Sequence, residues 1–208
     1  MARLESAGDL LTLPTALDPK YEIPTVLSEL GKKEGPAILF KKVKGYQSSV
    51  IGNVLGTKKR LSMALDVDPE DMVESAIPKL EKRISPVLVS DSSQRTVVTR
   101  KEKIDLPKLF PILTHYAKDS GPYITSGITS ARDPRNGSVG RGLHRMEVRG
   151  RNTLGISLLN PPLSEIYALY KEENKKMEVA TVIGVDPAIL IAAVFKIPRG
   201  VDKLSVAG

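Results

Sequence analysis

The sequence predicts a mixed α and β fold (α+β or α/β), in which an N-terminal α/β domain over residues 1–108 precedes a β-rich domain over residues 109–208. In the first half, short apolar runs alternate with amphipathic stretches, which is typical of strands and helices in one module. A proline-marked stretch at 106–111 separates the halves. Beyond it, β-branched runs lie between turn residues, which indicates antiparallel β structure, as part of a barrel or as a twisted sheet.

The elements of the first domain follow from local patterns. A helix is expected over 25–33. Thr57 predicts the start of a second helix over 58–64, because its hydroxyl can accept a hydrogen bond from the first turn. Asp68 and Pro69 predict a third start, since these residue types favour the N-cap and the first helical position. Four apolar runs predict strands: 37–40, 49–51, 86–89 and 96–99.

The elements of the second domain are predicted in the same way. Residues 133–137, Asp-Pro-Arg-Asn-Gly, have the chemistry of a tight turn and indicate a hairpin. A helix is expected over 163–176. Asp186 and Pro187 predict the start of an apolar helix that runs through Ala193. Further apolar runs predict strands at 123–129, 142–148 and 154–159, and a buried strand over 179–185.

Composition excludes several kinds of site. The chain has no Cys, which excludes disulfides, thiolate zinc sites, iron–sulfur clusters and Cys nucleophiles. Its two histidines, His115 and His144, cannot form a three-histidine metal site within one chain. No apolar run is long enough to span a membrane, and the N-terminus lacks the apolar core of a signal peptide. A cytoplasmic protein with no membrane span is therefore expected.

The charge balance gives a weaker indication of partners. The formal net charge is +7, from 31 Lys and Arg against 24 Asp and Glu. Solvated surface charge explains such an excess, and an acidic cofactor or substrate is the alternative. The basic residues are scattered and are not interleaved with aromatic residues, as a single-strand nucleic-acid binder requires. Nucleic acid is therefore not expected as a partner.

Two segments of the second domain are candidates for binding a ligand. The first, 123–130, is rich in small residues, and the hydroxyls of Thr125 and Ser126 could bind a planar ligand that approaches the backbone. The alternative is a twisted barrel strand whose small residues lie at a corner. The sequence alone leaves both interpretations open.

The second candidate segment is 140–145, Gly-Arg-Gly-Leu-His-Arg. Its glycines allow close approach to the backbone, and the forked guanidinium of an arginine suits phosphate or carboxylate. In a regular strand, Leu143 and Arg145 lie on one face and His144 on the other. An arginine there needs an anion, which is either a protein carboxylate such as Glu147 or a ligand. Both alternatives remain open at this point.

Short motifs are spread along nearly the whole chain: Gly35-Pro36-Ala37-Ile38-Leu39-Phe40, Gly52-Asn53-Val54-Leu55-Gly56-Thr57, Gly121-Pro122-Tyr123-Ile124-Thr125-Ser126-Gly127, Arg132-Asp133-Pro134, His144-Arg145-Met146 and Val182-Ile183-Gly184-Val185-Asp186-Pro187. Their order and spacing resemble the N-terminal half of the UbiD family of prenylated-FMN-dependent (de)carboxylases. The resemblance implies that the second domain is part of a flavin-reductase-like split β-barrel. It also implies a carboxy-lyase that acts on aromatic or α,β-unsaturated carboxylic acids.

The resemblance also implies roles for individual residues. Arg145 stands at the position of the family's catalytic arginine, which holds the substrate carboxylate. Contacts to a prenylated FMN are expected from this residue and its neighbours in the two candidate segments: Thr125, Ser126, Leu143, His144 and Arg145. A small carboxylic acid is the expected substrate.

The chain departs from the family pattern at the metal. Two family ligand positions fall on Gly140 and Ser164, neither of which is a good ligand for a divalent ion. No metal-binding residue is therefore predicted, and this chain alone is not expected to hold the family's Mn or Mg ion and its potassium. The remaining ligand, two catalytic glutamates and the rest of the barrel are expected beyond residue 208.

Three hypotheses follow. The chain is one subunit of a split UbiD-type enzyme that a second protein chain, or a homo-oligomer, completes. Alternatively, it is a non-catalytic UbiD-like scaffold, assembly or cofactor-handling subunit of a larger complex. The third hypothesis is a stand-alone basic binding module with the same fold.

Overall fold

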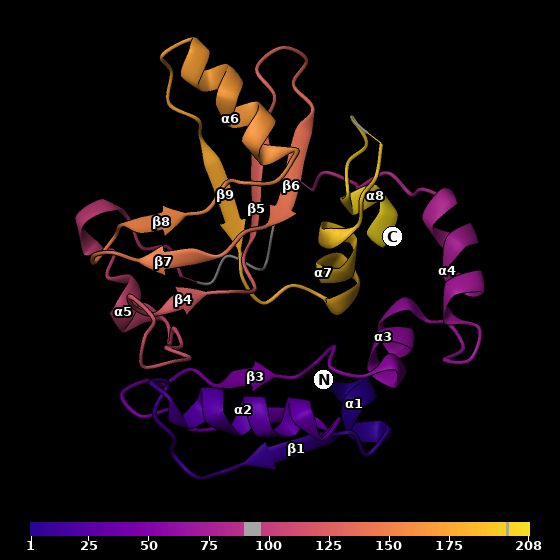
Figure 1. The fold of residues 1–208 in the computed structure, drawn as a ribbon, viewed down its shortest axis with the longest axis vertical. Coiled ribbons are helices and arrows are strands. Elements are labelled where there is room, and N and C mark those ends of the chain that lie inside the picture. The colour runs from indigo at the N-terminus through magenta and orange to yellow at the C-terminus, as the bar shows by residue number, and fades with distance from the viewer. Residues whose placement is uncertain (90–96, 199) are drawn as a thin grey trace. The chain divides into compact units, whose positions relative to one another are not determined.

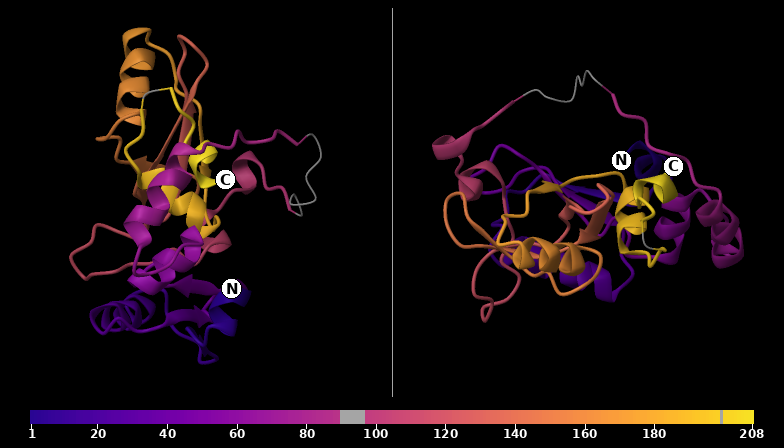
Figure 2. Two further views of the ribbon diagram at one scale, coloured as in Figure 1. Left: turned by 90° about the vertical axis from the view of Figure 1, so that its right-hand side faces the viewer. Right: turned by 90° about the horizontal axis from the view of Figure 1, so that it is seen from above.

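The computed structural model describes residues 1–89, 97–198 and 200–208. The chain forms two compact units, each assembled from several stretches of sequence (Figures 1 and 2). The first unit comprises Met1–Pro69, Val98–Ile124 and Glu147–Gly155, and the second comprises Glu70–Val97, Thr125–Met146 and Ile156–Gly208. The domain boundary predicted at residue 108 stays a prediction. No helix in the described ranges combines the length and the apolar character that a membrane span needs.

The first unit is built around a three-stranded sheet with the order β1-β2-β3, in which β1 is parallel and β3 antiparallel to β2. The sheet strands are β1 (Leu10–Leu13), β2 (Ala37–Phe40) and β3 (Val50–Gly52). The helices are α1 (Ala2–Ser6), α2 (Glu22–Lys32), α3 (Lys58–Leu65), the single turn Lys101–Lys103 and α5 (Leu106–Leu109). The strands predicted at 37–40 and 49–51 are thus confirmed, the second with a shift of one residue.

Helix α2 runs along this sheet and supplies one face of the first core (Figure 1). Ile23, Val26, Leu27 and Leu30 recur at helical spacing, so that they share one face and pack against the buried Phe40 of β2 and its neighbours. The helix begins at Glu22, three residues before its predicted start. This is possible because Pro24 lies in the first turn, where a proline removes no intrahelical hydrogen bond.

A buried arginine ties the loop before β2 to α3. Only 2% of the Arg60 surface is exposed. Its guanidinium donates to Asp9 Oδ1 at 2.9 Å and to the carbonyl oxygen of Gly35 at 2.9 Å. The amide of Asn53 donates to the same Gly35 carbonyl at 2.8 Å. The sequence suggested scattered surface charge for Arg60, and this is wrong because Asp9 and two loops enclose the side chain.

Two other residues of the same motif have local roles. A Cβ on Gly56 would lie 1.8 Å from Oδ1 of Asn53, so only glycine fits there. Thr57 accepts a hydrogen bond from the Arg60 N–H at 3.3 Å, which confirms the predicted cap of α3. The run 52–57 is thus explained by packing within the first unit.

A second three-stranded sheet has the order β4-β7-β8. Its strands are short: β4 (Tyr123–Ile124), β7 (Met146–Val148) and β8 (Leu154–Ile156). The strands predicted at 123–129 and 142–148 are each interrupted, since β4 ends at Ile124 and β7 begins only at Met146.

The second unit contains the third sheet, with the order β6-β5-β9 and antiparallel pairing throughout. Its strands are β5 (Ile128–Arg132), β6 (Val139–Leu143) and β9 (Val179–Val182), and its helices are α4 (Met72–Glu81), α6 (Leu163–Glu172), α7 (Pro187–Val194) and α8 (Leu204–Ala207). Helix α6 lies against one face of this sheet, where Leu163 and Ile166 pack on Ala131 (Figures 1 and 2). Helix α7 packs against β6 and α8.

Two predicted start and turn signals of the second unit are confirmed. The β5–β6 hairpin turns at 133–137, where Gly137 has a φ of 73° and Asp133 accepts hydrogen bonds from the backbone and guanidinium of Arg135. Asp186 caps α7 by accepting from the N–H of Ala188 at 2.9 Å. Both signals are side-chain hydrogen bonds to backbone groups close by in sequence, so the residue types alone predict them.

Other predictions for the second unit are wrong. Residues 86–89 form no strand, because no neighbouring strand pairs with them in the described structure. Of the strand predicted at 96–99, Thr96 lies outside the described residues and 97–99 have no regular structure. Helix α4 begins at Met72 and not at Pro69. The buried strand predicted over 179–185 is an exposed edge strand that ends at Val182.

The described strands thus form three separate three-stranded sheets, and no closed barrel is present among them. The mixed α and β class is confirmed.

Candidate functional site

The structure brings together the two segments that the sequence singled out. Strands β5 and β6 pair so that Ile128 lies opposite Leu143. The pairing continues past the strand ends, where the N–H of His144 donates to the carbonyl oxygen of Gly127 at 3.3 Å. The residues just before β5, which include Thr125 and Ser126, therefore lie beside the residues just after β6.

Side chains of the β6 end alternate as predicted. His144 is 5% exposed, whereas the Arg145 side chain is exposed and Leu143 is 36% exposed. Thr125 and Ser126 are also exposed. The segment thus presents two hydroxyls, an apolar side chain and a guanidinium to solvent, while the imidazole points into the protein.

His144 anchors the break between β6 and β7. Its Nδ1 lies 2.9 Å from the carbonyl oxygen of Ser157, and since a carbonyl oxygen can only accept, Nδ1–H is the donor of this hydrogen bond. The ring also requires a glycine beside it, because a Cβ on Gly142 would lie 2.7 Å from Nε2. The imidazole therefore fixes the backbone from which Arg145 projects. The predicted cofactor contact of His144 stays a prediction.

The Arg145 guanidinium makes no hydrogen bond or ion pair within the described part of the chain, although its carbonyl oxygen accepts from the N–H of Ser157 at 3.4 Å. The alternative of an ion pair with Glu147 is wrong, because that carboxylate accepts from Nε of Arg149 at 2.8 Å. Hydrogen bonds from the Ser120 hydroxyl and from Arg149 hold the pKa of Glu147 below its ordinary value, so it stays ionised and engaged. The guanidinium of Arg145 thus remains available to an anion.

The other arginine of the segment, Arg141, is fully engaged. Its Nε and Nη2 donate to the two carboxylate oxygens of Asp202 at 2.9 and 3.2 Å, and its Nη1 donates to the Ser130 hydroxyl at 2.8 Å. Asp202 also accepts from the N–H of Leu204 at 2.9 Å. Burial acts to raise the pKa of Asp202, but these hydrogen bonds outweigh it and lower the pKa. This ion pair joins β6 to the turn that precedes α8. It could not be predicted from the sequence, because Asp202 lies 61 residues from Arg141.

The two family positions for metal ligands do not fit a divalent ion. A Cβ on Gly140 would lie 2.5 Å from Ile166 Cδ1 and 3.0 Å from Pro162 Cγ, so Gly140 lies directly under α6 with no space for a side chain. Ser164, in the first turn of α6, offers only a neutral hydroxyl. In the parts of the chain that the structure describes, no group of three or more His, Asp or Glu side chains could hold a metal ion.

The residues around Arg145 do fit a planar anionic cofactor and a carboxylate. Exposed hydroxyls, exposed backbone and an unpaired guanidinium are the donors that bind phosphate and carboxylate oxygens. We therefore take Thr125, Ser126, Leu143 and Arg145 as the candidate site, with His144 as its support.

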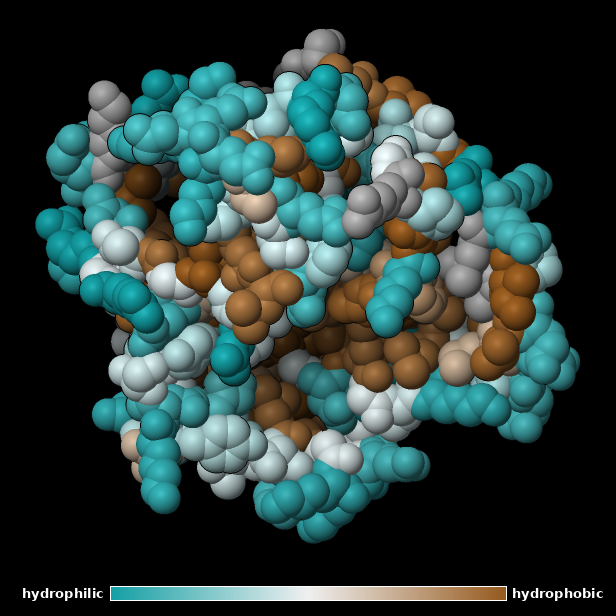
Figure 3. Space-filling model, turned by 45° about the horizontal axis from the view of Figure 1, so that its top comes forward, coloured by the Kyte–Doolittle hydropathy of each residue, from teal (hydrophilic) through white to brown (hydrophobic). Residues whose placement is uncertain are grey.

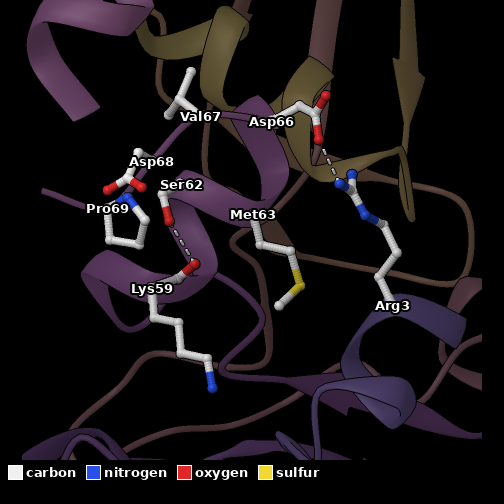
Figure 4. Close-up of a pocket in the computed structure, with 8 residues that line it drawn as sticks. All are labelled: Arg3, Lys59, Ser62, Met63, Asp66, Val67, Asp68 and Pro69. Atoms are coloured by element: carbon white, nitrogen blue, oxygen red, sulfur yellow. Dashed lines mark hydrogen bonds and ion pairs between the residues drawn. The ribbon is translucent and has the colours of Figure 1, made fainter. Parts of the chain in front are cut away.

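A separate cavity of about 470 Å³ lies in the first unit (Figure 4). It is lined by Arg3, Lys59, Ser62, Met63, Asp66, Val67, Asp68 and Pro69, and the exposed ion pair of Arg3 with Asp66, at 2.6 Å, lies at one side of it. None of the residues predicted for cofactor or substrate lines this cavity.

Comparison with known proteins identifies the family. Residues 1–80 match the model of the 3-octaprenyl-4-hydroxybenzoate carboxy-lyase N-terminal domain, and residues 87–208 match that of the 3-octaprenyl-4-hydroxybenzoate carboxy-lyase Rift-related domain. The anhydromevalonate phosphate decarboxylase of Methanosarcina mazei is 32% identical over 206 residues, which cover 96% of this chain and 45% of that protein.

Solved structures agree with the family models. The UbiD-class enzyme HmfF of Pelotomaculum thermopropionicum, in complex with FMN, is 35% identical with a TM-score of 0.92, over 99% of this chain and 46% of HmfF. The vanillic acid decarboxylase of Sedimentibacter hydroxybenzoicus, solved as ShVdcCD with a truncated ShVdcD, is 25% identical with a TM-score of 0.82, over 92% of this chain and 42% of that one.

The chain thus spans about half the length of these relatives. The family models account for both its N-terminal portion and the segment that carries the candidate site. The chain belongs to the UbiD family.

Proposed function

We propose that this chain is one subunit of a split UbiD-type carboxy-lyase, which a second polypeptide completes. The complex decarboxylates, or in reverse carboxylates, an aromatic or α,β-unsaturated carboxylic acid with a prenylated FMN. The observation that carries the proposal is the exposed guanidinium of Arg145, which has no partner among the described residues, on a segment that pairs next to Thr125 and Ser126. The chain is 35% identical to an enzyme solved with FMN. An evolved dimeric form of the same enzyme was solved with prFMN.

Arg145 binds the substrate carboxylate in this proposal. Its two outer N–H groups form parallel hydrogen bonds to the two oxygens, which holds the carboxylate in one plane. Lysine offers a single point charge, so it cannot fix the plane.

The other residues hold the flavin. Thr125 and Ser126 donate hydroxyl hydrogen bonds to its polar atoms, and the exposed Leu143 covers an apolar part of the ring. His144 holds the backbone of this segment through the Ser157 carbonyl. When bound, the prenylated flavin supplies the electron-accepting group that the bond cleavage requires. Because Gly140 and Ser164 do not fit a metal, we assign no step to a metal held by this chain.

The test of this function is decarboxylase activity of the complex isolated with the tagged chain. We expect Arg145→Ala to lower activity by about a hundredfold or more and Arg145→Lys to restore little of it. Arg3→Ala is the matched control, because Arg3 is an exposed arginine in the first unit. Full activity of the Arg145→Ala complex would contradict the assignment.

A non-catalytic scaffold or cofactor-handling subunit is the second candidate function. The absence of good metal ligands at Gly140 and Ser164 favours it. The two functions differ in what accompanies the chain. A catalytic complex carries a flavin absorption band and loses activity with Arg145→Ala, whereas a scaffold complex retains its activity in that variant.

A further inference from the structure

Arg145 stands between two buried side chains. Its neighbours His144 and Met146 are 5% and 2% exposed, whereas its own side chain is exposed. Hydrophilic and apolar side chains are mixed on the molecular face that Figure 3 draws, and surface side chains of either kind change rotamer quickly in solvent. The guanidinium has no partner in the described ranges, so its position depends on the backbone, which the two buried neighbours hold.

Met146 has an anchor of its own, just as His144 is anchored by the Ser157 carbonyl. The hydroxyl of Thr181, on β9, donates to Sδ of Met146 at 3.8 Å. The Thr129 hydroxyl, which belongs to a fully buried residue of β5, lies 3.0 Å from the same Thr181 oxygen. Thr129 can therefore donate to Thr181 while Thr181 donates to the sulfur.

The register of the sheet β6-β5-β9 places these groups in one row. Gly142 lies opposite Thr129, and Thr129 lies opposite Thr181. Residues that lie directly opposite each other in an antiparallel pair share one face of the sheet. The His144 ring lies against Gly142, since a Cβ on that glycine would be 2.7 Å from Nε2. The row thus connects the two buried neighbours of the site arginine, His144 at one end and Met146 at the other.

We propose that Thr181 is a positioning residue for Arg145, which it holds in place through Met146. This inference rests on the proposed function, in which the guanidinium binds the substrate carboxylate. A bidentate pair requires both partners in one plane, so a small tilt of the arginine backbone weakens both hydrogen bonds. The hydroxyl–sulfur bond is weak, but it acts on a buried side chain next to the arginine and limits how far this backbone can turn.

Steady-state kinetics of the complex isolated with the tagged chain test this role. Thr181→Val keeps the shape of the side chain and removes its hydroxyl, whereas Thr181→Ser keeps the hydroxyl. We expect Thr181→Val to raise KM for the carboxylic acid and to lower kcat/KM by about tenfold, and Thr181→Ser to restore most of this loss. Thr12→Val, at an exposed position of the edge strand β1, is the matched control and should leave both constants unchanged. A merely structural role would reduce the amount of folded complex, which lowers the maximal rate but not the affinity for substrate.

Thr129→Val separates the contact with sulfur from the loss of a buried hydrogen bond. In Thr181→Val the buried Thr129 hydroxyl loses its partner, which costs stability, whereas the double variant removes both hydroxyls and avoids most of that cost. We expect KM to stay raised in the double variant and to be unchanged in Thr129→Val alone. Recovery of KM in the double variant would overturn the inference, because the contact with Met146 is still missing there.

Arg145→Ala shows whether Thr181 acts through the arginine. We expect Thr181→Val to cause no further loss of activity in the Arg145→Ala complex, because a residue that acts through Arg145 has nothing left to position. A further loss there would overturn the inference, and so would an unchanged KM in Thr181→Val when Arg145→Ala has lost its activity. Both results leave the proposed function intact. Full activity of Arg145→Ala would instead contradict the proposed function, and the role of Thr181 with it.

Discussion

The first and second units differ in how far they bury their edge strands and pair their arginines. Each has a three-stranded sheet whose middle strand is buried: Phe40 of β2 and Thr129 of β5 are both 0% exposed. In the first unit the edge strands β1 and β3 have mixed burial, and the buried Arg60 is paired through both terminal nitrogens. In the second unit all of β9 is exposed and Arg145 has no partner among the described residues. The first unit thus pairs the terminal nitrogens of its buried arginine internally and leaves only Nε of Arg60 without a partner in the described ranges, whereas the second unit exposes a strand and a guanidinium to solvent.

The largest effect is expected at the buried arginine of the first unit. Arg60→Ala leaves the Asp9 carboxylate without its ion-pair partner, removes one of the two donors to the Gly35 carbonyl and opens a cavity. We therefore expect a loss of about 3–5 kcal/mol in the free energy of unfolding. Urea denaturation of the complex measures it. Lys59→Ala, an exposed neighbour, should change the same quantity by less than about 0.5 kcal/mol. Equal effects of the two substitutions would show that the pairing in the first unit is not what stabilises it.

The next effect concerns the tight contact under α6. Gly140→Asn places an amide oxygen at one of the two family positions for metal ligands, yet its Cβ clashes with Ile166 and Pro162. We expect it to destabilise the second unit by about 1–3 kcal/mol without creating a metal site. Thermal denaturation and metal analysis measure the two results. Gly150→Asn is the control, since a Cβ there makes only ordinary contacts. A stable variant with a stoichiometric divalent ion would contradict our account of Gly140.

A smaller, pH-dependent effect on the free energy of unfolding is expected from the ion pair of Arg141 with Asp202. Because the pKa of Asp202 is lowered in the folded protein, the stabilisation is present at pH values above the unfolded pKa of about 4 and is lost as the pH falls through the folded value. Asp202→Asn removes this dependence and costs about 1–2 kcal/mol at pH 7. Unfolding free energies measured between pH 7 and pH 3 test it. An unchanged pH profile in the variant would assign the acid sensitivity to other carboxylates.

The smallest effect is expected at the surface. Arg3 and Asp66 form an ion pair at 2.6 Å, but their side chains are 64% and 76% exposed. Water and salt screen such a pair, so Arg3→Ala should cost no more than about 0.5 kcal/mol. The measurement is urea denaturation at low and at high salt. A larger loss would mean that the first unit depends on its surface charges and not only on the buried arginine.

Local signals in the sequence predicted local structure well. The cap at Thr57, the turn at 133–137 and the start at Asp186 are correct because the side chain that makes each hydrogen bond is adjacent in sequence to its partner. The predicted alternation of Leu143, His144 and Arg145 is also correct, because successive side chains of an extended segment point to opposite faces. Strand β1 was missed, and its pairing partner β2 is distant in sequence.

The remaining features depend on partners that are distant in sequence. Arg60, Arg141 and Arg145 look alike in sequence, but the first is paired with Asp9 in the interior and the second with Asp202. The guanidinium of the third has no partner in the described ranges. Burial of β9 was predicted from its apolar composition. Composition indicates that a strand is stabilised by apolar contacts, but it does not show whether other residues of this chain make those contacts. The same limit explains the failed strand at 86–89.

Native mass spectrometry of the complex isolated with the tagged chain tests the central claim most directly. We predict an assembly in which the 22.6 kDa chain is bound to a polypeptide with the second half of the UbiD sequence and to a flavin. A stable 22.6 kDa monomer without flavin or partner would contradict the claim.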